Sequence, residues 1–145
     1  MRSESLTILV AAAAICSCTF AQELPSRKVL TIDLAQTIAQ EALAKCRADG
    51  YRVTVRVVDA DNVVKVILRD DDAILNSVQL AQQKTSSAVL SPFLVGRGGA
   101  SPTVGIPIRV DGQTIGAVGV SGSPGLDKDA VCANAALSKV ADRLR

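Results

Sequence analysis

Apolar residues recur every three to four positions in three stretches of the chain, a spacing that predicts three amphipathic helices. The predicted helices span about Ile32–Ala48, Ala73–Leu90 and Asp127–Leu144. We expect Thr31 to cap the first helix, and Gly50 lies just beyond its end. The aspartates at positions 70–72 are expected to cap the second helix, which should end at Ser91-Pro92. Asp127 is the expected cap of the third.

Between the first two predicted helices, apolar and polar residues alternate, which is typical of strands. Tyr51 to Val58 and Val63 to Leu68 are predicted to pair as a hairpin around the turn formed by residues 59–62. In the first strand the valines at 53, 55 and 57 should face the core, and Arg52, Thr54 and Arg56 should lie on a wet or interfacial face.

A second hairpin is predicted around Asp111-Gly112, because Asp-Gly between two β-rich runs favours a two-residue turn. If Val110 and Gln113 close the turn, Ile108 opposes Ile115 further along. Glycines 116, 119 and 122 have no side chains, so another part of the protein can approach the backbone of this hairpin closely on one face. The elements follow the order α-β-β-α-β-β-α, which predicts a single α+β domain with helices packed on one antiparallel sheet.

The amino-acid composition argues against one class of function, nucleic-acid binding. The 145 residues are 48% hydrophobic but only 2% aromatic, and the formal net charge is +2 with the charges scattered. A domain of this size can bury a substantial core, and here the core must be aliphatic. Scattered charge and few aromatic rings argue against a nucleic-acid surface.

The first 21 residues resemble a secretory signal peptide. Arg2 precedes an apolar run from Leu6 to Ile15, and Ala21 ends a small-x-small cleavage pattern. The run is too short for an ordinary membrane span. We therefore predict a signal peptide at 1–21, a leader at 22–29, a domain at 30–145, and export to the periplasm or the cell exterior. Lipidation at Cys18 is the alternative.

Cleavage after Ala21 would leave two cysteines, Cys46 and Cys132, in an oxidising compartment. Both lie in predicted apolar helix stripes. They form either one disulfide or two buried thiols, and the sequence does not decide between these.

The residues available for chemistry are few. Histidine is absent, which removes the commonest general base and the commonest metal and haem ligand. No catalytic constellation or metal site is predicted, and we expect a protein that is not an enzyme. Lys84 in the second helix either belongs to a solvated face or binds an anionic ligand, and Arg97 among glycines either holds an anion or lies in a surface loop.

The second hairpin also resembles a known family. Its sequence, Gly-Ile-Pro-Ile before the turn and Ile-Gly-Ala-Val-Gly-Val-Ser-Gly after it, is similar to the GlcG/HbpS family of haem-associated proteins. Further similarities are Leu30-Thr31, residues 57–60, Lys84 and Cys132-Ala133. The connector formed by residues 91–104 is shorter than in family members, where this region helps to form the haem site.

The resemblance implies a profilin-like domain that assembles into a homo-oligomer and binds haem or another small anionic ligand. No other cofactor is expected. Combined with the residue analysis, it predicts a ligand site that includes Lys84, Thr85, Arg97 and Thr103. The alternative is a non-catalytic structural or accessory oligomer with no bound ligand.

Overall fold

A computed structural model describes residues 26–94 and 105–145 of the chain. The elements are α1 (Ile32–Ala48), β1 (Thr54–Asp59), β2 (Val64–Arg69), α2 (Ser77–Leu94), β3 (Ile106–Val110), β4 (Gln113–Ser121), α3 (Leu126–Lys139) and a final 3-10 turn, η1 (Ala141–Leu144). This order confirms the predicted α+β fold with two hairpins.

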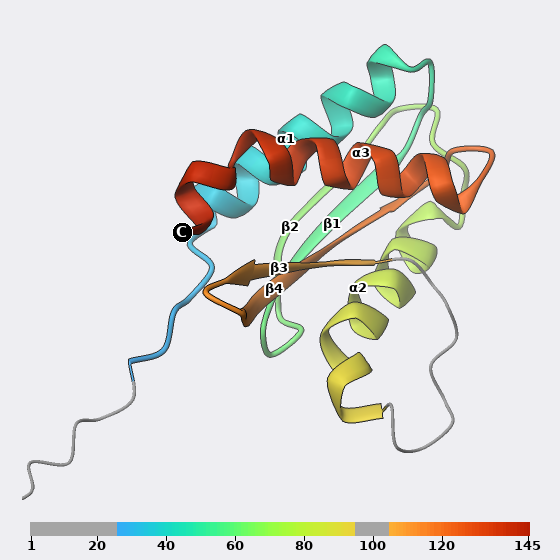
Figure 1. The fold of residues 1–145 in the computed structure, drawn as a ribbon. Coiled ribbons are helices and arrows are strands. Elements are labelled where there is room, and N and C mark those ends of the chain that lie inside the picture. The colour runs from blue at the N-terminus through green and yellow to red at the C-terminus, as the bar shows by residue number, and fades with distance from the viewer. Residues whose placement is uncertain (1–25, 95–104) are drawn as a thin grey trace, which may run out of the picture.

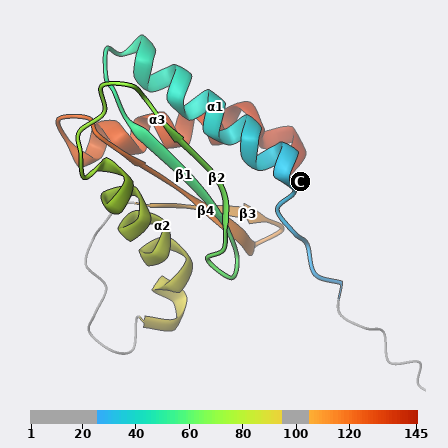
Figure 2. The same cartoon turned by 180° about the vertical axis from the view of Figure 1, so that it is seen from behind.

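The two hairpins join into one antiparallel sheet with the strand order β2-β1-β4-β3. Figures 1 and 2 show α1 and α3 side by side on one face of this sheet and α2 on the other. The hairpins meet through β1 and β4, with Thr54 opposite Ser121 and Asp59 opposite Gly116. The sheet therefore has two covered faces, and its edge strands are β2 and β3.

The face under α1 and α3 carries the main hydrophobic core. Val53, just before β1, and Val55 and Val57 of β1 are fully buried there, as the alternation predicted. Thr31 caps α1, its Oγ1 accepting a hydrogen bond from the Leu34 N–H at 3.4 Å. A disulfide joins Cys46 of α1 to Cys132 of α3, with their Cα atoms 5.5 Å apart.

The two alternatives predicted for the opposite face both occur: Arg52, just before β1, is exposed to solvent, whereas Thr54 and Arg56 are interfacial. Thr54 is 0% exposed and Arg56 is 6% exposed because α2 covers them. The close approach of α2 depends on Gly119 of β4, where a Cβ atom would lie 2.6 Å from the Ala81 carbonyl oxygen. At Gly119 the glycine-lined face of the hairpin is therefore covered by α2 of the same chain, and it is not available there for contact with a second copy.

The start and end of α2 differ from the prediction. The helix begins at Ser77 and continues through Ser91 and Pro92 to Leu94. Asp70 does not cap it, because its carboxylate is held by Arg47 of α1. Ile74, inside the predicted second helix, precedes the observed helix and is half exposed. Asp127 likewise lies inside the first turn of α3, whose N-cap is Gly125.

The second hairpin confirms the turn but not the whole register. Val110 pairs with Gln113 as predicted, whereas Ile108 pairs with Gly116 instead of Ile115 because of a bulge next to Arg109. At Gly116 a Cβ atom would lie 2.2 Å from the Val58 carbonyl oxygen. Beyond the bulge, Val118 and Val120 face the core under α1 and α3, and Ala117 belongs to the small apolar cluster under α2.

The N-terminal segment before α1 is anchored to both hairpin turns. Arg27 pairs with Asp61 at 2.6 Å, and Lys28 pairs with Asp111. Leu30 is 2% exposed and belongs to the core. The predicted signal peptide falls outside the described residues, and within them no helix combines the length and apolar character needed to cross a bilayer.

Candidate ligand site

Lys84, the cation predicted to meet a ligand, lies inside the protein. Its side chain is 2% exposed, so the solvated interpretation is wrong. The ammonium donates to Asp129 Oδ2 of α3 at 2.6 Å and to the Val120 carbonyl of β4 at 2.6 Å. Its charge is therefore already balanced by a buried carboxylate in the structure.

The unequal lengths of β3 and β4 explain why Lys84 reaches across the sheet. The pairing of β3 with β4 ends where Ile106 opposes Val118, so Val120 lies beyond the last β3 partner. A buried carbonyl that accepts no hydrogen bond would destabilise the fold, and the Lys84 ammonium donates the hydrogen bond that the Val120 carbonyl needs. From there the side chain meets α3 on the other face and ties the two helical layers together.

Thr85 faces a different part of the structure. It is fully buried, and its Oγ1 accepts a hydrogen bond from Arg56 Nη1 of β1. Its own hydroxyl proton is directed to the backbone carbonyls of Ala81 or Gln82. Lys84 and Thr85 are thus neighbours in α2, but their side chains form hydrogen bonds with different strands, β4 and β1.

Arg56 is a buried cation that the sequence analysis missed. Burial lowers the pKa of its guanidinium, which nevertheless stays protonated because the usual value lies so high. Within the described ranges it has an ion pair with no carboxylate, and Thr85 is its side-chain partner. Alternation alone placed Arg56 correctly on the second face, but nothing in the sequence indicated that α2 covers that face.

A pocket lies directly over the Lys84–Asp129 pair, and we call it the α3 pocket. Its volume is about 300 Å³. It is lined by Ile74, Leu80, Lys84, residues 121–126 and Asp129. Asp129 Oδ1 accepts from the Ser123 N–H at 3.1 Å, which fixes the loop between β4 and α3 along one wall. The α3 pocket combines aliphatic walls with a buried ion pair.

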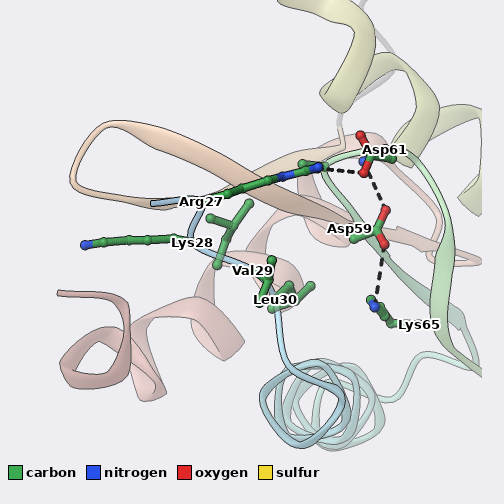
Figure 3. A pocket seen from close by; sticks show the side chains of 9 residues that line it. Arg27, Lys28, Val29, Leu30, Asp59, Asp61 and Lys65 are labelled. Atoms are coloured by element: carbon green, nitrogen blue, oxygen red, sulfur yellow. Dashed lines mark hydrogen bonds and ion pairs between the residues drawn. The ribbon is translucent and has the colours of Figure 1, made fainter. Parts of the chain in front are cut away.

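A second, smaller cavity lies where the N-terminal segment crosses the turn of the first hairpin (Figure 3). It measures about 110 Å³, and four of its charged residues pair with one another: Arg27 with Asp61 at 2.6 Å, and Lys65 with Asp59 at 3.6 Å. The fifth, Lys28, pairs with Asp111 in the turn of the second hairpin. Asp59 Oδ1 also accepts from the Asp61 and Val63 N–H groups, as expected of a turn aspartate. These charges have local partners and offer no strong ligand site.

A third hollow is a surface groove of about 550 Å³ along α2, lined by Gln79, Gln82, Gln83 and Ser86. It offers amides but no charge or apolar wall among these residues. Arg97 and Thr103, the other two predicted ligand residues, lie outside the described residues. Of the four predicted residues, Lys84 lines the α3 pocket, and Thr85 lies on the face of α2 that is buried against the sheet.

Comparisons with known proteins identify relatives of the chain. The family model described as "Haem degrading protein HbpS-like" matches residues 30–93 and 98–138. No curated protein sequence matches the chain.

Solved structures also match. A crystal structure of HbpS shares 27% identity, with 81% of this chain and 94% of that chain covered and a TM-score of 0.68. A PduOC:haem complex shares 25% identity, with coverage of 77% and 94% and a TM-score of 0.64. Protein ORFY from Klebsiella pneumoniae shares 26% identity, with coverage of 80% and 94% and a TM-score of 0.65.

The donor set of this chain does not fit a haem iron held by histidine. The sequence has no histidine, and its one methionine is Met1, outside the described residues. Cys46 and Cys132 are bonded to each other, and the Tyr51 ring has the Lys128 ammonium 5.3 Å from its centroid. The α3 pocket, at about 300 Å³, is also at the lower end of the size range of ligand pockets.

Proposed function

The chain belongs to the HbpS-like family, and we propose that it is an exported, oligomeric, non-catalytic protein that binds haem or a similar anionic tetrapyrrole. Family membership carries this proposal. The PduOC:haem complex, which has the same fold over 94% of its chain, supports it. The chain has haem-binding relatives whether or not it binds haem itself.

The absence of histidine shapes how such a ligand is held. We expect apolar contact with the ring and pairing of its carboxylates with cations, rather than an iron–histidine bond. Lys84 is compensated by Asp129, so Arg97 is the better candidate for a ligand carboxylate. Thr103 is the neighbouring hydroxyl predicted at the same site.

A titration with haem and with metal-free protoporphyrin IX tests the proposal. Because ring and carboxylates carry the binding, we expect saturable binding of both at micromolar concentration, with dissociation constants within about tenfold of each other. Arg97→Gln should weaken the binding of both ligands by about fivefold to tenfold. The exposed Arg109 of β3 provides the matched control, Arg109→Gln, which should leave both unchanged.

Two results would contradict the proposal. The absence of any saturable change in the Soret band would show that the protein does not bind a tetrapyrrole. Loss of the Soret band on incubation with ascorbate and oxygen, faster than for free haem, would show turnover and contradict the non-catalytic assignment.

Export requires a separate test. We expect protein recovered from the periplasm or the medium to begin at Gln22, by intact mass. A lipid-modified N-terminus at Cys18 would instead support the lipoprotein alternative, and an unprocessed cytoplasmic chain would contradict export.

The alternative function, an accessory oligomer without ligand, is favoured by one observation. The edge strand β2 exposes Val64 by 45% and Ile67 by 42%, and an unpaired apolar edge can join a second sheet. Sedimentation as an oligomer together with no tetrapyrrole binding would favour this alternative. Sedimentation as a monomer would contradict the assembly that both proposed functions include.

A further inference from the structure

The α3 pocket has the arrangement of a small-molecule site, with apolar walls above a polar floor. Leu80 and Pro124 contribute to the walls, and Ile74 and Leu126 are 50% and 52% exposed beside the opening. Large aliphatic side chains that gather around a hollow often mark a surface that a ligand covers.

The floor offers a hydrogen-bond donor. A lysine ammonium has three N–H groups. Those of Lys84 meet two acceptors, the Val120 carbonyl and Asp129 Oδ2, and within residues 26–94 and 105–145 no third acceptor is present. Lys84 also lines the pocket.

The charges around the pocket disfavour an anion. Asp129 already balances Lys84, so a carboxylate ligand would bring uncompensated negative charge next to a buried carboxylate. Asp127, in the first turn of α3, lies beside Gly125 at the pocket wall and adds a second negative charge there. An uncharged acceptor can take the free N–H without this cost.

We propose that the α3 pocket binds a small uncharged ligand with an aliphatic chain and one carbonyl or hydroxyl oxygen. The oxygen accepts from Lys84 at the floor, and the chain packs between Ile74, Leu80 and Leu126. This proposal does not rest on tetrapyrrole binding or on Arg97 and Thr103.

The experiment is an amide NMR titration of the purified protein with hexanamide, compared with hexanoate of the same chain length. We expect saturable shifts of the amide signals of Leu80, residues 121–123, Gly125 and Leu126, and weaker binding of hexanoate. Leu126→Ser should weaken hexanamide by about fivefold, which corresponds to about 1 kcal/mol. Ile74→Ser, on the other side of the pocket, provides a second variant with the same expected effect.

Val131→Ser is the matched control. Val131 is 51% exposed on the same helix as Leu126 but does not line the pocket, so binding should stay within twofold. The proposal is overturned if hexanamide produces no saturable shifts at these residues, if Val131→Ser weakens binding as much as Leu126→Ser, or if hexanoate binds more tightly than hexanamide.

Discussion

The two faces of the sheet are both buried, yet they are built from different chemistry. Under α1 and α3 the buried side chains are almost entirely aliphatic. Under α2 the apolar cluster is small, consisting of Val58, Val89 and Ala117. Besides Ala81, the other buried positions of this layer are polar or charged: Thr54, Arg56, Ser77, Lys84 and Thr85.

This difference implies that the two layers respond differently to substitution. An apolar face is stabilised by area removed from water, and losses there scale with the volume removed. A polar face is stabilised only while each buried group keeps its partner. Thr54 Oγ1 lies 2.8 Å from Ser77 Oγ, and Lys84 meets Asp129, so α2 is positioned by a few directional contacts.

Breaking the Lys84–Asp129 pair should produce the largest effect. Lys84→Met leaves the Asp129 carboxylate buried without its cation, and we expect a loss of about 4 kcal/mol in the free energy of unfolding. Adding Asp129→Asn should restore much of this loss, because the remaining charge is removed while the Ser123 N–H keeps an acceptor. Urea unfolding monitored by circular dichroism measures each variant.

The control for this prediction is the same substitution in an exposed pair. Lys45 and Asp49 of the α1 end lie 2.6 Å apart with side chains 38% and 31% exposed. Lys45→Met should therefore cost no more than about 1 kcal/mol. Equal losses for Lys84→Met and Lys45→Met would show that the polar layer under α2 is not the sensitive one.

The aliphatic layer is expected to lose somewhat less when its disulfide is removed. Cys46 and Cys132 are 86 residues apart in sequence, so the bond restricts a long loop in the unfolded chain. We expect Cys46→Ala/Cys132→Ala to cost about 2–4 kcal/mol. The double variant should be insensitive to dithiothreitol, whereas the wild-type chain should lose stability on reduction. Alkylation of both thiols in the unreduced mature protein would contradict the bond.

The sequence predicts the aliphatic layer much better than the polar one. Helical spacing identified α1 and the Asp-Gly turn identified the Val110–Gln113 pair, because both are local signals. The bulge that redirects Val118 was missed because it depends on the contact of Gly116 with β1, a strand far away in sequence.

Lys84 could not be interpreted from its own neighbourhood for the same reason. Its acceptors are Val120, 36 residues away, and Asp129, 45 residues away. A lysine among Thr and Ser in a helix has the sequence signature of a solvated face. Only the short pairing of β3 with β4 reveals the unpaired carbonyl that makes its burial favourable.

The smallest predicted effect concerns the place where the two layers meet. Asp70 follows β2 and leads towards α2, and Arg47 of α1 holds its carboxylate through bonds of 2.9 and 3.0 Å. The hydrogen bonds from the Arg47 guanidinium hold the pKa of Asp70 below its ordinary value. The folded pKa is thus lower than the unfolded one, so the pair stabilises the fold fully above about pH 4.

As the pH falls below that value and through the folded pKa, this contribution is lost. The difference in urea midpoint between the wild type and Asp70→Asn should therefore be largest near pH 6 and vanish at the acid end. Asp142→Asn is the control, because Asp142 pairs with Arg145 where both side chains are at least 80% exposed, and the difference should stay near zero throughout. A wild-type advantage over Asp70→Asn that is constant with pH would mean that packing around Asp70, and not its charge, joins α1 to the α2 layer.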